Sequence, residues 1–172
     1  KVKKFHLHDD FKQFMTVYLP TVTQEMDGLI FTPVKDPIRI GTHETMFKWK
    51  PRNKNTIDFK VKKSPTVETP GCVPGRHTWR LFIQEKGKLI HESQIPLDRM
   101  SDYSWLKEDD IVECMYVTWE KGPLWWKPLK KRTDKTFPNN RRTFYRTLVN
   151  IKEDIQMKEF LDCIPGCNDY LH

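Results

Sequence analysis

Two lysines that flank one tryptophan form the first candidate for phosphate chemistry. Lys48, Trp49 and Lys50 lie in a short run that ends at Pro51. Because successive side chains of a strand point to opposite faces, the lysines share one face and Trp49 points the other way, into a core. Each ammonium about 4 Å from a phosphate gives roughly 4 kcal/mol of gross attraction at an effective dielectric near 20. The pair indicates a phosphate-binding face, although a solvated strand face is the usual role of this spacing.

An acidic residue in front of a glycine and an apolar run is a candidate metal ligand. Asp27 precedes Gly28, and Leu29, Ile30 and Phe31 follow. A carboxylate held at the edge of a strand is well placed to bind a divalent cation. The alternative is an ordinary Asp-Gly turn.

A third cluster, from Lys130 to Arg142, contains six basic residues and one acid. A diffuse charge of this kind would form an RNA-facing patch. The order Arg132, Asp134, Lys135, followed by Pro-Asn, favours a shaped loop instead. In such a loop Asp134 would orient its basic neighbours toward phosphate.

The composition bounds the class of protein. Thirty lysines and arginines against 23 aspartates and glutamates give the 172 residues a formal charge of +7. This charge favours an anionic partner such as nucleic acid or a nucleotide, although it can also serve only solubility. Ten Phe, six Trp and five Tyr can bury a core and exclude low-complexity disorder. No apolar run approaches the ~18 residues of a membrane span, so we expect no membrane partner.

The four cysteines predict reduced thiols in an intracellular compartment. They form no C-x-x-C pair and lack the second ligand pair of a zinc finger. They are Cys72, Cys114, Cys163 and Cys167.

The elements that must position these clusters begin with a mixed helical and strand region. A short strand is expected around Val2 to Phe5, followed by a helix that starts at Asp9-Asp10 and stops at Pro20. Residues 29–31 predict a short buried strand and 46–50 the next strand. Residues 56–62 alternate, with Ile57, Phe59 and Val61 on one face and Asp58, Lys60 and Lys62 on the other.

A proline- and glycine-rich linker at residues 64–75 separates this region from a β-rich one. The β-rich region predicts a hairpin and two further strands, enough for a small closed barrel of the oligonucleotide/oligosaccharide-binding (OB) type. Apolar spacing then predicts helices at the carboxyl end. The expected ranges are strands 79–84, 89–93, 111–119 and 124–131, and helices 143–155 and 157–161.

Three segments together resemble the later motifs of the covalent nucleotidyltransferase superfamily, and among its members the mRNA capping guanylyltransferases. "DGLIFTP" is similar to motif IV, "FKWKP…NTIDF" to motif V, and "RTDKTFPNN" to motif VI. The resemblance implies an α+β fold class. Residues 1–64 would be the carboxyl-terminal part of a nucleotidyltransferase domain, 65–140 an OB-fold domain with motif VI at 132–139, and 141–172 a helical segment.

The resemblance also implies a reaction and its site. In that family a lysine attacks the α-phosphate of GTP, and GMP then passes from the lysine to the 5′-diphosphate end of RNA. Carried over by position, Asp27 would hold the divalent metal, Mg²⁺ or Mn²⁺. Lys48 and Lys50 would contact the α-phosphate, where fixed cations stabilise developing charge. The motif VI core, Arg132, Asp134 and Lys135, would approach the β- and γ-phosphates as the OB domain closes.

The amino end carries a weaker correspondence. Phe5 lies where the family has an aromatic residue that stacks on guanine. An ordinary core phenylalanine is the alternative.

One departure from the family is large. The nucleophilic lysine belongs to a Lys-x-Asp-Gly motif, but the residue two positions before Asp27 is Glu25. Together with the absence of an initiator Met, this predicts that the nucleophile and the first half of the domain lie outside the chain. The segment 143–161 is compatible with fusion to triphosphatase and methyltransferase domains, as in large DNA viruses. A cytoplasmic location, in a viral factory or virion, follows from that origin, with the nucleus of a cellular organism as the alternative.

Two rival functions belong to other classes. ATP-dependent polynucleotide ligases share the fold and the Lys-x-Lys strand, but Trp49 between the lysines and the Asn-Thr-Ile-Asp-Phe sequence favour capping. The non-enzymatic rival is an RNA-binding OB module in which tryptophans stack on bases. Its candidate platforms, for which a core role is also open, are Trp79, Trp105, Trp119, Trp125 and Trp126.

Overall fold

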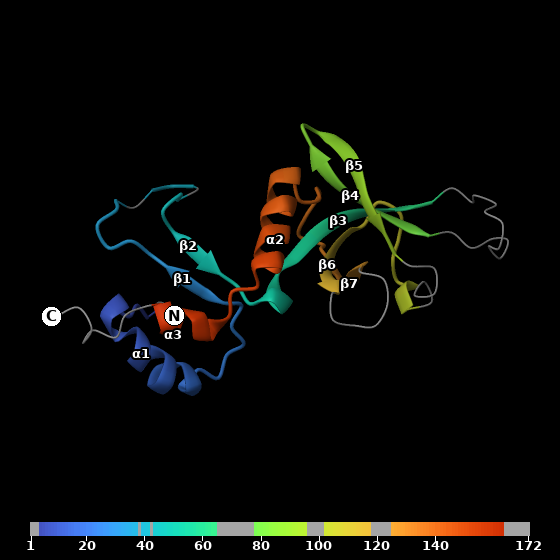
Figure 1. The fold of residues 1–172 in the computed structure, drawn as a ribbon. Helices are drawn as coiled ribbons and strands as arrows, with labels where there is room; N and C mark the ends of the chain where they lie inside the picture. Colours follow the sequence, from blue (N-terminus) through green and yellow to red (C-terminus); the bar gives the residue numbers. More distant parts are fainter. Residues whose placement is uncertain are drawn as a thin grey trace. The chain divides into compact units, whose positions relative to one another are not determined.

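The computed structural model describes residues 4–37, 39–41, 43–64, 78–95, 102–117 and 125–163 (Figure 1). The chain divides into two compact units. The first comprises Lys1–Pro51 and Asp154–His172, and the second comprises Arg52–Glu153. Among the described helices, none has the length and apolar character that crossing a bilayer requires.

The first unit begins with the predicted helix, whose helical type changes along its length. It starts beside the acidic pair and ends just after Pro20, where Val22 takes an extended conformation. Lys4 and Phe5 are not in a strand, contrary to the expectation for this segment, and Val2 lies outside the described residues. The helical segments are η1 (His8–Asp10), α1 (Phe11–Gln13), η2 (Phe14–Tyr18) and η3 (Leu19–Thr21).

Two short strands and a helix complete the first unit. Strands β1 (Leu29–Phe31) and β2 (Phe47–Trp49) pair antiparallel, with Leu29 opposite Trp49 and Ile30 opposite Lys48. Helix α3 (Met157–Cys163) brings Phe160 against Phe31 and Trp49. The expectation that 29–31 is a buried strand is wrong, because the side chain of Ile30 is half exposed.

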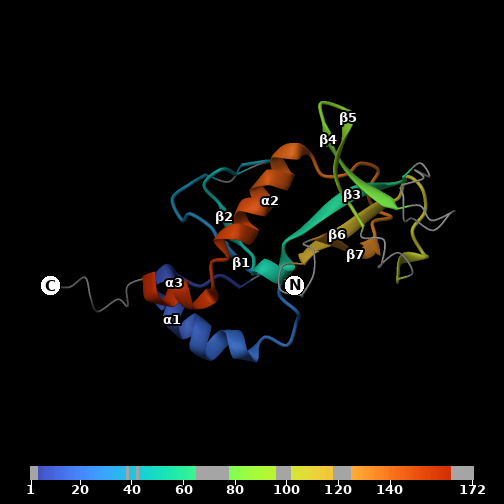
Figure 2. The same ribbon diagram turned by 45° about the vertical axis from the view of Figure 1, so that its right-hand side comes forward.

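The second unit is built on one antiparallel sheet in the order β5-β4-β3-β6-β7 (Figures 1 and 2). The outer strands β5 and β7 also approach one another, as in the five-stranded barrel expected of an OB-fold. A short turn, η4 (Arg52–Lys54), leads into it. The strands are β3 (Thr56–Lys63), β4 (Trp79–Glu85), β5 (Lys88–Gln94), β6 (Ile111–Val117) and β7 (Trp125–Lys131).

Alternation along β3 sets the barrel core. Ile57, Phe59 and Val61 are fully buried, as their spacing predicts. Phe59 lies at the centre, with its ring edge-on to Trp126 and to Phe144. Aromatic pairs of this geometry add to the stability given by burial alone.

The tryptophans of the barrel are mostly core residues. Trp79, Trp125 and Trp126 are buried, which excludes them as stacking platforms, whereas Trp105 is partly exposed. Trp119 lies outside the described residues. The proposal of a tryptophan-lined RNA surface is therefore wrong for these three side chains.

Helix α2 (Arg141–Glu153) packs against the barrel. Asn140 caps its first turn, because its side-chain oxygen accepts a hydrogen bond of 2.8 Å from the Thr143 amide. Phe144 and Ile151 are buried toward the barrel. The helix begins and ends two residues earlier than its apolar spacing predicts.

The boundary between the units falls between Pro51 and Arg52, earlier than the predicted residue 64. The physical reason is that β3 pairs with both β4 and β6 in the middle of the barrel sheet. The expected strand at 56–62 thus belongs to the OB-fold and not to the domain before it.

Of the four cysteines, Cys114 is the one whose side chain the structure describes. It is buried in the barrel, and that burial raises the pKa of its thiol well above the usual range. Cys114 is therefore a neutral core residue, in agreement with the predicted reduced thiols. Cys72 and Cys167 lie outside the described residues.

Candidate functional site

The Lys48–Trp49–Lys50 segment presents two ammoniums on one exposed face. Trp49 is buried, and its indole Nε1 donates a 2.9 Å hydrogen bond to the carbonyl oxygen of Ile155. The ring of Phe160 meets it edge-on at 5.4 Å. These contacts fix the strand, so Lys48 and Lys50 face solvent on its other side.

Gly28 brings the segment that carries Asp27 against the same strand. A β-carbon at Gly28 would lie 2.0 Å from the carbonyl oxygen of Trp49 and 3.0 Å from the Cα of Lys50. Its φ of +155° also disfavours side chains, so this close approach requires glycine. Asp27, the residue before Gly28, therefore lies next to this backbone contact, and its carboxylate is exposed.

Asp27 offers one exposed carboxylate as a candidate ligand for a divalent metal. Within the described ranges, no three His, Cys, Asp or Glu side chains come together as a metal cage. Mg²⁺ in phosphate-binding sites takes one or two carboxylates and completes its shell with water and phosphate oxygens. A single exposed carboxylate fits that mode of binding.

Phe5 is exposed and lies outside any strand. The alternative of an ordinary core phenylalanine is wrong, because 77% of its surface is accessible. Its stacking on guanine stays a prediction.

In the second unit, a buried carboxylate holds the motif VI cations. Asp58, which is 3% exposed, accepts hydrogen bonds of 3.0 and 3.1 Å from Nη1 of Arg132 and a further one from Nζ of Lys135. Asn139 fixes the backbone of Asp58 from both sides. Its side-chain oxygen accepts from the Asp58 amide, and its own amide donates to the Asp58 carbonyl, each at 2.8 Å.

Asp134 binds the other edge of the same guanidinium. Its two oxygens accept from Nε and Nη2 of Arg132 at 3.0 and 2.8 Å, a fork-to-fork pair. The hydrogen bond from Arg132 lowers the pKa of Asp134 to about 2, and the same bond raises the pKa of Arg132 above its usual value. Asp134 therefore pairs with its basic neighbour Arg132, and both groups stay charged at neutral pH. Its role in turning that neighbour toward phosphate stays a prediction.

Glu113 on β6 extends the network. Its carboxylate lies 3.6 Å from Nη1 of Arg132 and 3.3 Å from Nζ of Lys130, and it accepts a 2.9 Å hydrogen bond from the Thr56 hydroxyl. Three cations and three carboxylates thus meet at one end of β3 and β6. The cluster has no net charge, and Asp134 is its most exposed carboxylate.

The structure brings together Arg132, Asp134 and Lys135 in one unit and Asp27, Lys48 and Lys50 in the other. It adds Asp58, Glu113 and Asn139, which the sequence reasoning missed. Asp58 does lie on the polar face of β3, as its spacing predicts. The signal available in the sequence is a carboxylate between two apolar residues, Ile57 and Phe59, in the segment that resembles motif V.

Comparison with known proteins places both units. Residues 54–161 match the family model described as "mRNA capping enzyme, C-terminal domain", and residues 1–52 match "mRNA capping enzyme, catalytic domain". The chain belongs to the mRNA capping enzyme family. The border between the two matches lies within two residues of the Pro51–Arg52 border between the units, which agrees with the placement of β3 in the barrel.

Capping enzymes of eukaryotes align over most of the chain. The mRNA-capping enzyme of Caenorhabditis elegans is 30% identical over 92% of this chain, and that of Danio rerio is 28% identical over 95%. The mRNA-capping enzyme subunit alpha of Schizosaccharomyces pombe is 25% identical over 95%. The chain spans 25%, 25% and 42% of the lengths of these three relatives, respectively.

Proposed function

We propose that this chain is part of an mRNA guanylyltransferase, which transfers GMP from GTP through a lysine–GMP intermediate to the 5′-diphosphate end of RNA. The observation that carries the proposal is the pair of exposed ammoniums on either side of the buried Trp49, in a chain of the capping enzyme family. Membership of that family favours GTP over the ATP of polynucleotide ligases.

Lys48 and Lys50 are proposed to bind the α-phosphate. Lys48 lies in β2, Lys50 directly follows the strand, and both side chains are exposed, so one phosphate can contact both ammoniums. Charge that develops on the phosphate during transfer is stabilised most by cations that are already in place. Asp27 would hold Mg²⁺ or Mn²⁺, which when bound neutralises charge on the phosphates.

Arg132 and Lys135 are proposed to bind the β- and γ-phosphates. The buried Asp58 fixes one edge of the guanidinium, and the exposed Asp134 occupies the edge that a phosphate would take. A phosphate oxygen pair matches a guanidinium in the same bidentate manner as a carboxylate. Binding would then exchange Asp134 for the nucleotide.

The test is formation of the covalent GMP adduct in a protein that joins these 172 residues to a Lys-x-Asp-Gly segment. Lys48→Ala and Lys50→Ala should each slow adduct formation from α-labelled GTP at least about tenfold, equivalent to about 1.4 kcal/mol of transition-state stabilisation. Lys12→Ala, which removes an exposed lysine of the helical stretch, is the matched control. Equal rates for all four proteins, wild type included, would refute the proposal.

The nucleophile is proposed to lie outside the 172 residues, since Lys-x-Asp-Gly does not occur among them. Incubation of the chain alone with labelled GTP and Mg²⁺ or Mn²⁺ should give no acid-labile label. A label on any lysine would contradict this assignment. Preference of the joined protein for ATP over GTP would overturn the capping assignment in favour of a ligase.

We also propose the origin and location that the fusion hypothesis implies: a multifunctional enzyme of a large DNA virus that acts in the cytoplasm. The helical segment after motif VI supports this proposal. Reading the coding sequence on both sides of this chain tests the proposal, because triphosphatase and methyltransferase domains should flank it.

A further inference from the structure

We infer that the outer face of β3, β4 and β5 binds single-stranded RNA, with Arg80, Phe82 and His91 as its centre. The inference rests on the proposed function only in the choice of RNA as the polyanion. It concerns a surface of the barrel and does not involve the phosphate-binding residues described above.

The strand register lines these side chains up across the sheet. Lys60 pairs with Phe82, which pairs with His91, and this gives one row. Lys62 pairs with Arg80 in the neighbouring row. Residues two apart on β3 and β4 share a face, and the fully buried Val61, Leu81 and Ile83 point to the other side, into the core. The two rows therefore lie together on the outside of the barrel.

Planar groups in this patch contact one another and are accessible in part. The guanidinium of Arg80 lies over the ring of Phe82 at 5.2 Å from its centroid, and the His91 ring lies 5.4 Å away on the neighbouring strand. Arg80 and Phe82 are partly exposed, and His91 is exposed. Bases of single-stranded RNA stack on such aromatic rings and on guanidinium planes.

His91 serves here as a ring and not as a cation. Its partial burial, and next the nearby charge of Arg80, lower its pKa below the ordinary value of 6.5. The imidazole is consequently neutral at physiological pH. The positive charge of the patch comes from Arg80, Lys60 and Lys62, although both lysines share an ion pair with Asp109 at 3.8 and 3.2 Å.

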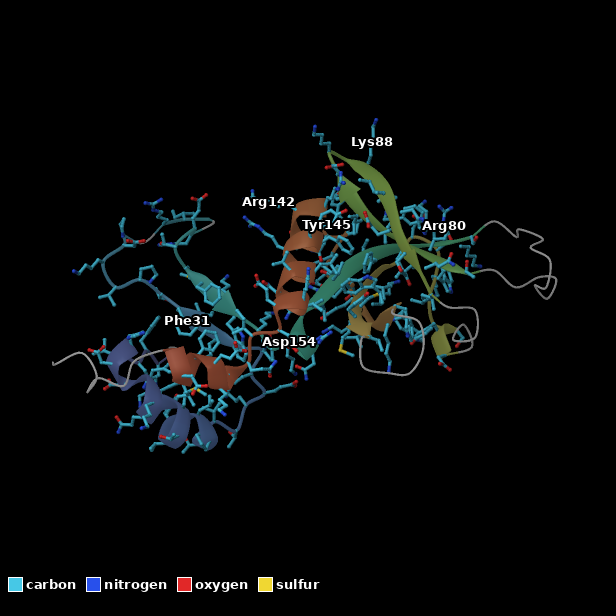
Figure 3. All side chains as sticks on the ribbon, viewed as in Figure 1. Phe31, Arg80, Lys88, Arg142, Tyr145 and Asp154 are labelled. Carbon is cyan, nitrogen blue, oxygen red and sulfur yellow. The ribbon has the colours of Figure 1, made fainter. Side chains whose placement is uncertain are left out.

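The hairpin extends the cationic side of the patch. Figure 3 shows Arg80 toward one end of the β4–β5 hairpin and Lys88 at its tip, where β5 begins. Lys86 and Gly87 form the turn, both with positive φ, which fits the tight turn preferred between twisted strands. Lys86 and Lys88 are exposed, so a strand of RNA along the hairpin would meet cations beyond the rings of Phe82 and His91.

Single-stranded RNA fits this surface better than an acidic peptide does. A polyanionic peptide needs cations but gains little from planar side chains, whereas every base offers a ring face. The patch combines both features on the strand pair with which OB-folds commonly bind oligonucleotides. Its aromatic groups are Phe82 and His91, since the barrel tryptophans Trp79, Trp125 and Trp126 are buried in the core.

The experiment measures fluorescence anisotropy of a labelled single-stranded RNA of about 20 nucleotides with the 172-residue chain, from low to high salt. His91→Ala should weaken binding at least about fivefold without changing the salt dependence, because it removes a neutral stacking ring. Arg80→Ala should weaken binding and reduce the slope of log K against log salt by about 0.7, the value for one phosphate contact on a single strand. Arg80→Lys should restore the slope of log K against log salt, because it keeps the cation, but it should not restore stacking on a guanidinium plane.

Matched controls lie on the exposed side of α2. Arg146→Ala and Tyr145→Ala remove a cation and a ring outside the patch, and each should change the affinity by less than about twofold. Thermal unfolding of each variant confirms that the barrel is intact. A duplex of the same sequence should bind more weakly than the single strand.

Three outcomes would overturn the inference. The first is unchanged RNA affinity in His91→Ala. The second is equal weakening by Arg146→Ala and Arg80→Ala, which would indicate diffuse attraction only. The third is binding of a phosphorylated acidic peptide with no binding of RNA. Because GTP and guanylyl transfer are absent from this assay, its failure would leave the proposed function untouched, and failure of adduct formation would leave RNA binding untouched.

Discussion

Replacing Asp58 by asparagine tests the idea that one buried carboxylate holds the motif VI loop. The carboxylate accepts three hydrogen bonds from two cations, Arg132 and Lys135. Asparagine keeps one acceptor oxygen but turns an NH₂ group toward a cation. At least one charge-assisted bond is lost, and such a bond contributes about 1.5–3 kcal/mol.

The partial exposure of Arg132 and Lys135 limits the loss of stability in Asp58→Asn. Breaking a fully buried ion pair costs about 3–5 kcal/mol, but the side chains of Arg132 and Lys135 are 23% and 35% exposed and regain hydration. We therefore expect Asp58→Asn to lower the free energy of unfolding by about 2 kcal/mol, or the melting temperature of the barrel by about 8–16 °C. We also expect the motif VI loop to loosen, so that trypsin cleaves faster after Arg132 and Lys135.

The assay is thermal unfolding of wild type, Asp58→Asn and Asp134→Asn, followed by fluorescence of the buried barrel tryptophans. Asp134 binds the same guanidinium but its side chain is 64% exposed, so its variant should lose clearly less stability. The reasoning is refuted if Asp58→Asn melts no lower than Asp134→Asn and its loop resists trypsin as well as that of wild type.

Three further predictions concern packing, backbone and pH. Phe144→Ala should lower the free energy of unfolding by about 3–5 kcal/mol and detach α2 from the barrel. Circular dichroism should then show loss of helical signal before the barrel melts, and helicity that persists until the barrel melts would contradict the prediction. Gly28→Ala should break the β1–β2 pairing, because the new methyl would overlap the Trp49 carbonyl oxygen, and amide exchange in β1 should accelerate while the barrel amides stay protected. The pKa of Asp134 falls from 3.8 to about 2 on folding, so its stabilising effect is present above pH 4 and is lost toward pH 2. The difference in stability between wild type and Asp134→Asn should shrink across that window, and a constant difference would show that the Arg132 pair is not its source.

The barrel strands were predictable because their apolar periods are strong and local. Residues 56–62 alternate strictly, and the turn at Lys86-Gly87 separates two runs of β-forming residues, so both features are visible without tertiary contacts. The partners of β3 were not visible. The sequence of a strand does not reveal which strands it pairs with, so the proline-rich segment after Ser64 predicts a domain border that the structure places before β3.

The candidate site was predictable in part for a similar reason. The resemblance to known motifs named Lys48, Lys50, Arg132, Asp134 and Lys135, but periodicity could not reveal that Asp58 is buried. Its burial arises from Arg132 and Lys135, more than seventy residues away in sequence, which fold over it. Such a contact depends on closure of the whole barrel, which no local window contains.

The two carboxylates that accept hydrogen bonds from Arg132 differ in exposure, and this difference bears on recognition of anions. A long side chain normally loses rotamer entropy when a ligand fixes it. Here Asp58 has already fixed the guanidinium, so an anion that replaces Asp134 meets a donor pair in its final orientation. That entropy is lost during folding and not during binding. If Arg132 binds phosphate as proposed, the fold has oriented its guanidinium in advance, and the exposed carboxylate of Asp134 that occupies the site can return to water.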